Sequence, residues 1–110
     1  MSKLNRVQSI NAVLNIFRTA IPFSTTNTLI AFIHVATNEG CYVGDVQRAC
    51  GMAATSTSRA VQILFKRHRA KDGYNLVESR TDWDDQRHKR LYLTPKGERL
   101  WATILEAIDR

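Results

Sequence analysis

The chain changes abruptly from an alternating pattern to a helix signal at residues 89–97, and this transition constrains its fold most. In residues 89–94 two leucines alternate with Tyr92, as in a strand with one apolar side. Thr94-Pro95 follows directly, and threonine followed by proline favours a helix whose first residue is Pro95. We therefore expect a strand over 89–94 and a final helix over 95–110.

A second strand-like run, Tyr74–Thr81, precedes the first, and seven mostly charged residues separate the two. That spacing is too long for a tight turn and predicts an open hairpin over residues 74–94. Upstream, apolar residues at helical spacing predict a helix over about 4–20, ended by Pro22. A second helix capped by Ser24, Thr25 or Thr26 is expected to close near Gly40. Residues 41–43 are short and apolar, as in a brief strand.

Gly51 lies between two further helical patterns, about 44–50 and from Ala54 to as far as Arg69. Glycine tolerates the left-handed backbone that a tight turn between crossing helices requires. This arrangement predicts a helix-turn-helix over residues 44–69. The fold class expected is mainly α with a small β-hairpin: a winged helix-turn-helix over 1–110, with an N-terminal helix within 1–23 and a C-terminal helix over 95–110.

The helix that begins at Ala54 has two chemically different sides. At 100° per residue, its inner side contains Thr57, Ala60, Val61, Leu64 and His68. Its outer side contains Thr55, Ser58, Arg59, Gln62, Lys66 and Arg69. Hydroxyls, an amide and cations are the groups that contact bases and phosphates in a major groove. A solvated face of an ordinary amphipathic helix fits equally well, but the small residues at the start, Ser56 among them, would let the backbone approach a phosphate.

The positive charge of the chain is concentrated in its middle. The 110 residues have 16 Lys and Arg against 10 Asp and Glu, a net charge of +6. Residues 1–42 contribute +2, residues 43–71 contribute +5 and residues 72–110 contribute −1. The excess favours a polyanionic partner and lies where the helix-turn-helix is expected.

Two blocks of the sequence resemble the MarR (multiple antibiotic resistance regulator) family of winged helix-turn-helix transcription regulators. The resemblance spans about residues 24–105. The first block is Gly51-Met52 with Thr57-Ser58-Arg59. The second runs Asp85-Gln86-Arg87-His88-Lys89-Arg90-Leu91-Tyr92-Leu93-Thr94-Pro95-Lys96-Gly97, and matches the family's Asp-x-Arg-x-x-Arg wing signature and Leu-Thr-x-Lys-Gly exit.

The resemblance implies a homodimer on duplex DNA, with the recognition helix in the major groove and the wing in the minor groove. By position, Arg87 would enter the minor groove, Asp85 would orient it, and Arg90 would pair with the acid or with phosphate. We expect Arg59 and Gln62 to contact bases. The remaining expected DNA contacts are Thr55, Ser56, Ser58, Lys66, Arg69 and Lys89. A salt-bridged hairpin without nucleic-acid contact is the alternative for the wing.

Several positions depart from the family pattern. Residues 66–73 form a basic insertion, which would either lengthen the recognition helix or make a loop with extra phosphate contacts. Thr57 stands where an apolar residue is usual, so looser packing is expected there. The wing tip contains three acidic residues, Asp82, Asp84 and Asp85. Their negative charge opposes the approach of phosphate unless Arg80, Arg87 or Lys89 pairs with them. The terminal helices are shorter than in most members of the family, where they form the dimer interface. The resemblance therefore carries no expectation about a small-molecule effector.

Other chemistry has little support. Cys41 and Cys50 are expected to be inert, although a redox switch would need only a thiol of lowered pKa. The histidines lack metal-ligand spacing, so no metal or cofactor is expected. Trp83 would stack on DNA, shield the base of the wing or simply be exposed. An enzyme is not expected, because the acidic residues near His88 lie on one loop with no implied pocket.

The sequence thus predicts a sequence-specific regulator of transcription that binds double-stranded DNA, most simply a dimeric repressor. The alternative is a winged-helix module that binds another protein, as an antirepressor or assembly factor would. With no secretion signal or membrane-spanning run, a cytoplasmic location is expected.

Overall fold

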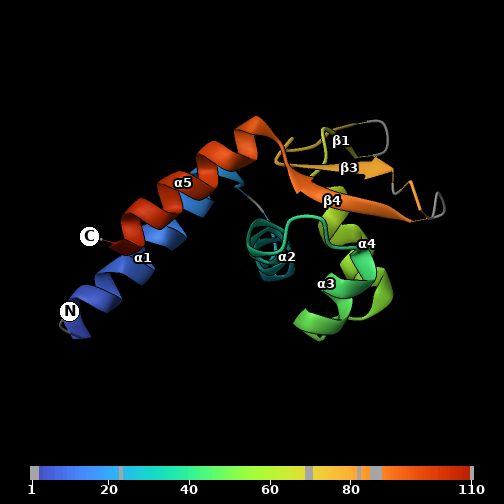
Figure 1. Ribbon diagram of the computed structural model, residues 1–110. Coiled ribbons are helices and arrows are strands. Elements are labelled where there is room, and N and C mark those ends of the chain that lie inside the picture. The colour runs from blue at the N-terminus through green and yellow to red at the C-terminus, as the bar shows by residue number, and fades with distance from the viewer. Residues whose placement is uncertain (1–2, 23, 69–70, 82, 85–87, 110) are drawn as a thin grey trace.

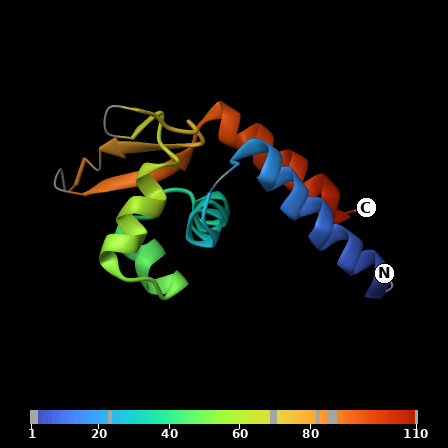
Figure 2. The same cartoon turned by 180° about the vertical axis from the view of Figure 1, so that it is seen from behind.

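The chain folds into a helical arm joined to a winged helix-turn-helix body (Figure 1). The structure is a computed structural model, and it describes all residues except 1–2, 23, 69–70, 82, 85–87 and 110. The arm pairs α1 (Lys3–Ala20) with α5 (Pro95–Asp109), so both termini lie at its far end (Figure 2). The winged helix-turn-helix with flanking terminal helices, expected from the sequence, is confirmed.

The helix-turn-helix consists of α3 (Val43–Cys50) and α4 (Ala54–Gln62), which pack on α2 (Thr26–Thr37). Gly51 joins α3 to α4 with φ of 66°, the left-handed conformation expected for that turn. Among the three candidate caps for α2, Thr25 is the one used: its Oγ1 accepts a hydrogen bond from the Thr28 amide at 3.3 Å.

The wing is an antiparallel pair, β3 (Val77–Thr81) and β4 (Lys89–Leu93). Its register aligns Val77 with Leu93 at the base. Cys41 forms an isolated bridge to Leu91, so of the apolar run 41–43 only this residue joins the sheet. The expected strand there is otherwise wrong, because Val43 is already the first residue of α3.

The junction between the wing and α5 follows the sequence pattern. Pro95 is the first helical residue, and the Thr94 hydroxyl accepts a hydrogen bond from the Gly97 amide at 3.0 Å. The same hydroxyl donates to the Asn75 carbonyl at 2.7 Å. The cap therefore also ties the start of α5 to the segment that leads into β3.

The end of α4 differs from the expectation. The helix ends at Gln62, well before Arg69, and residues 67–72 form a small hairpin of β1 (Arg67–His68) and β2 (Lys71–Asp72). The reason is a competing set of backbone bonds. The carbonyls of Ile63 and Leu64 accept from the amides of Tyr74 and Leu76 at 3.1 and 2.8 Å, instead of from the next helical turn.

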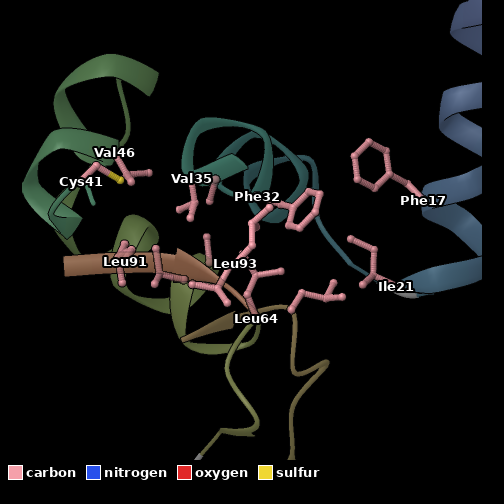
Figure 3. Packing of buried hydrophobic residues seen from close by; sticks show 14 of the residues in the cluster. Phe17, Ile21, Phe32, Val35, Cys41, Val46, Leu64, Leu91 and Leu93 are labelled. Atoms are coloured by element: carbon pink, nitrogen blue, oxygen red, sulfur yellow. The ribbon is translucent and has the colours of Figure 1, made fainter. Parts of the chain in front are cut away.

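One apolar core joins the arm, the helices and the wing (Figure 3). Phe32 of α2 is fully buried at its centre and meets Phe17 of α1 edge to face, with ring centroids 5.9 Å apart. Leu91 and Leu93 reach the same core from β4, as their alternation with Tyr92 predicted. Burial of this kind is the main driving force holding the elements together.

The arm keeps part of its apolar surface outside this core. Val7, Ile10 and Leu14 of α1 are each more than half exposed, and Leu105 and Ile108 of α5 are about 40% exposed. The helix expected from the apolar spacing in α1 is confirmed, but among its described apolar side chains only Phe17 is fully buried, together with Ile21 just after the helix. None of the helices, over the parts described, is long and apolar enough to cross a membrane.

Candidate nucleic-acid interface

The outer side of α4 is an exposed polar surface. Thr55, Ser58, Arg59 and Gln62 are exposed on it, and Ser56 is half-buried. The amide of Gln62 lies 3.4 Å from the Ser58 hydroxyl, one helical turn away. Short side chains lie at the start of α4, and the longer Arg59 and Gln62 side chains follow them. The longer side chains have the length needed to reach base edges in a major groove.

The inner side of α4 packs without a gap at Thr57. This side chain is fully buried, and its hydroxyl donates to the Ala53 carbonyl at 2.9 Å. The expectation of looser packing at a threonine is wrong, since the bond to the preceding turn satisfies the hydroxyl in the core. Val61 and Leu64 are buried beside it, which holds the outer residues in a fixed orientation.

The start of α3 is held by a charged cap. The Tyr42 amide donates to Asp45 Oδ2 at 2.9 Å, and Arg48 Nη2 lies 2.5 Å from Asp45 Oδ1. The hydrogen bond from the Tyr42 amide, and then the hydrogen bond and positive charge of Arg48, lower the pKa of the Asp45 carboxyl below its usual value. Asp45 therefore caps the start of α3 by accepting from the Tyr42 amide.

Arg90 anchors the wing to the helix-turn-helix. Its Nη1 donates to the Gly40 carbonyl at 2.9 Å, and its guanidinium lies 4.8 Å from the centre of the Tyr42 ring. The Gly40 amide in turn donates to the Leu91 carbonyl at 2.8 Å. Arg90 is half-buried at this junction, so its position suits alignment of the wing more than an outward phosphate contact.

Arg80 is engaged along the wing itself. It lies 2.8 Å from Glu78 and 4.1 Å from the centre of the Tyr92 ring. Trp83 is 87% exposed, so it does not shield the base of the wing. Lys89, another expected DNA contact, is exposed at the start of β4. Asp85 and Arg87, the expected wing-tip pair, lie outside the described residues, as does Arg69 of the basic insertion.

A hollow of about 420 Å³ lies between the wing and the start of α3, and no feature of the sequence predicts it. Its lining includes Tyr42, Gly44, His88 and Lys89. The rings of Tyr42 and His88 meet edge to face, with centroids 5.8 Å apart. No sequence signal marked Tyr42, because its role depends on the distant residues His88 and Arg90.

The two cysteines do not form a reactive thiol site. Burial raises the pKa of the Cys41 thiol, and the nearby Asp45 carboxylate adds to the effect. Burial also raises the pKa of Cys50. Thiols with raised pKa contain less of the reactive thiolate, which supports the inert interpretation over a redox switch.

Comparison with solved structures shows a winged-helix fold of the MarR type. The chain superimposes on a mutant of S. aureus MepR bound to an oligodeoxyribonucleotide with a TM-score of 0.72 at 16% identity, covering 97% of this chain and 72% of that one. A MarR transcriptional regulator from Methanosarcina mazei Go1 gives 0.68 at 18%, covering 96% and 69%. A MarR-like transcriptional regulator from Thermotoga maritima gives 0.65 at 23%, covering 99% and 77%.

Sequence comparison adds nothing to the structural likeness. No protein-family model matches the chain, and no curated protein matches it significantly. The chain spans 60–77% of the length of the regulators that it resembles in fold. The comparisons therefore show a winged-helix fold of the MarR type, with α3, α4 and the wing in the corresponding arrangement.

Proposed function

We propose that this protein is a transcription regulator that binds double-stranded DNA in a sequence-specific manner. The observation that carries the proposal is the exposed polar side of α4, held next to the wing in a fold shared with an oligonucleotide-bound regulator. The concentration of positive charge in residues 43–71 supports the same partner.

The groups on α4 and the wing divide the contacts. Arg59 and Gln62 read base edges in the major groove, because guanidinium and amide groups bond in pairs to guanine and adenine. Thr55, Ser56 and Ser58 bind phosphates at the start of α4, where backbone amides add to the attraction. Arg87 enters the minor groove with Asp85 orienting it, and Lys89 binds phosphate. Arg90 positions the wing through Gly40 and Tyr42.

The regulator acts as a homodimer through the arm. The apolar residues left exposed on α1 and α5 form an elongated surface that a second copy would cover: Val7, Ile10, Leu14, Leu105 and Ile108. A two-fold dimer would place two copies of α4 on successive turns of one DNA face. Repression is the simplest outcome, because a bound dimer obstructs the DNA that it covers.

The experiment that tests this proposal is selection of bound duplexes from fragmented genomic DNA, followed by titration at several salt concentrations. We expect enrichment of a two-fold-related site and an affinity that falls steeply with salt, since phosphate contacts release counterions. Failure to enrich any duplex, or an affinity independent of salt, would contradict the proposal.

A second candidate function is a winged-helix module that binds another protein. The supporting observation is the acidic balance of residues 72–110, which have eight acidic and seven basic residues and include the wing. Pull-down with and without nuclease separates the two candidates. A partner that the wild-type chain retains after nuclease treatment, and loses on Trp83→Ala, favours the module.

A further inference from the structure

The small hairpin between α4 and β3 is a feature that the recognition helix and the wing do not explain. It pairs β1 with β2 in the register Arg67 to Asp72 and His68 to Lys71. It begins only a few residues after α4 ends. Its strands lie in the stretch where the basic insertion was noted, so the described residues of the insertion do not lengthen α4.

The hairpin is strongly basic and exposed. Residues 66–72 contain four Lys or Arg and one Asp. Lys66, Arg67 and Lys71 are exposed, and none forms an ion pair with another described residue. Asp72 faces Arg67 across the pair, yet no salt bridge joins them within the part of the chain described. These cations are therefore available to an external anion.

Backbone hydrogen bonds close the base of the hairpin, and Tyr74, next to that base, donates its hydroxyl to the Pro22 carbonyl after α1. The Gly73 amide donates to the Lys66 carbonyl at 2.9 Å, and the Asn75 amide donates to the Phe65 carbonyl at 3.1 Å. A Cβ at Gly73 would lie 1.9 Å from the Phe65 carbonyl oxygen, so the strands meet here in a contact that only glycine allows. The cations are thus held at a set position relative to α4, which lowers the entropy lost on binding.

The hairpin and the wing lie on the same side of the molecule. In Figures 1 and 2 both extend away from the arm, and the elements follow in the order α4, β4, β3, then the β1–β2 hairpin. The hairpin therefore lies on the far side of the wing from the recognition helix. A duplex that contacts α4 and the wing would pass next to the hairpin if it continued straight.

We propose that the β1–β2 hairpin is a second, sequence-independent wing that binds the phosphate backbone of the same duplex, beyond the segment read by α4 and the β3–β4 wing. This inference rests on the proposed DNA-binding function. Arg67 and Lys71 neutralise phosphates, with Lys66 adding a third cation near the end of α4. Such contacts lengthen the DNA segment covered and raise affinity for all sequences equally.

The composition of the hairpin favours DNA over an acidic protein. Stable protein interfaces are organised around buried apolar or aromatic anchors. Residues 66–72 contain no large apolar side chain, only cations, a histidine, an alanine and an aspartate. Phosphates at regular spacing can be bound by cations alone, and four of these seven residues are Lys or Arg.

The test compares Arg67→Gln/Lys71→Gln with Arg18→Gln/Arg99→Gln, which removes the same charge from exposed positions on the arm. Binding is measured by fluorescence anisotropy on a 40-base-pair random duplex and on a genomic duplex chosen by selection. We expect the hairpin variant to reduce the slope of log K against log salt by about 1.8, because each neutralised phosphate contributes about 0.9. The ratio of affinities for the two duplexes should stay unchanged.

Each outcome bears on the inference separately from the proposed function. A hairpin variant whose salt slope equals that of the arm variant overturns the inference, although the wild type still binds duplex. A wild type that binds neither duplex overturns both. A hairpin variant with normal duplex binding that no longer binds immobilised poly-glutamate assigns the hairpin to an acidic protein and overturns the inference. Circular dichroism melts confirm that both variants fold.

Discussion

Arg90 of β4 donates a 2.9 Å hydrogen bond to the carbonyl of Gly40, fifty positions earlier in the chain. This contact joins the wing to the turn that precedes α3, and it adds a side-chain link to the backbone bonds between Gly40, Cys41 and Leu91. The wing signature implied that Arg90 pairs with the acid or with phosphate. In the structure its guanidinium contacts the Gly40 carbonyl and the Tyr42 ring, so we propose that it also positions the wing.

Replacing Arg90 by glutamine should destabilise the fold by about 1–2 kcal/mol, because a charged hydrogen bond and a cation–π contact are lost together. Urea unfolding measures the change. Lys89→Gln is the matched control, since it removes the same charge from the preceding position, which is exposed. Equal stability of the two variants would show that Arg90 does not anchor the wing.

Gly73 and Gly51 should respond differently to alanine. At Gly73 the new Cβ would meet a backbone oxygen at 1.9 Å, so we expect a loss of about 3 kcal/mol or more. At Gly51 no atom lies within 4 Å of the added Cβ, so only the left-handed backbone would be strained. We expect that strain to lower the stability by about 1 kcal/mol. Thermal unfolding separates the two values. A smaller effect at Gly73 than at Gly51 would contradict the close contact.

An aspartate at Ile10 should separate the proposed dimer. Ile10 is 59% exposed on α1, so the substitution costs the single chain little but places a charge in the surface that a second copy would cover. Sedimentation equilibrium at micromolar concentration measures the mass. Ile30→Asp, at a residue 38% exposed on α2, is the control. Wild type that is already monomeric, or Ile10→Asp that stays dimeric, argues against the arm as the interface.

Asp45 should make part of the stability depend on pH. The pKa of the Asp45 carboxyl is lower in the folded state than in the unfolded chain. The contribution of Asp45 to folding stability is therefore fully present above its pKa in the unfolded chain, and is lost as the pH falls through its pKa in the folded state. Asp45→Asn should therefore be less stable than wild type at pH 7, and the difference should shrink below about pH 4. The check is urea unfolding across this range with Glu106→Gln as control. A difference that persists unchanged in acid would exclude the carboxylate cap.

The sequence predicted elements whose signals are local. Thr94 and Pro95 start α5 as expected, and Gly51 makes the left-handed turn, because capping and turn geometry depend on neighbouring residues. The burial of Leu91 and Leu93 followed from their alternation with Tyr92. The two sides of α4 also separated as the helical period indicated, with Val61 buried and Arg59 exposed.

Features that depend on residues far apart in the chain could not be predicted from the local sequence. The end of α4 was placed too late, since the carbonyl of Leu64 bonds to the amide of Leu76 and the helical pattern contains no sign of that competition. The sequence predicts loose packing at Thr57, because it does not show that the hydroxyl donates to the Ala53 carbonyl within the core. The junction of Arg90 with Gly40 and Tyr42 is likewise a product of tertiary packing.

If α4 reads base sequence as proposed, Arg59→Ala should change both the affinity and the base preference of binding. On the duplex obtained by selection, we expect this variant to lose about 1–3 kcal/mol of binding free energy, roughly fivefold to 150-fold in Kd, and to show relaxed preference at one base pair. Arg18→Ala on the arm should leave both unchanged. Binding by Arg59→Ala with wild-type affinity and wild-type base preference would contradict the account.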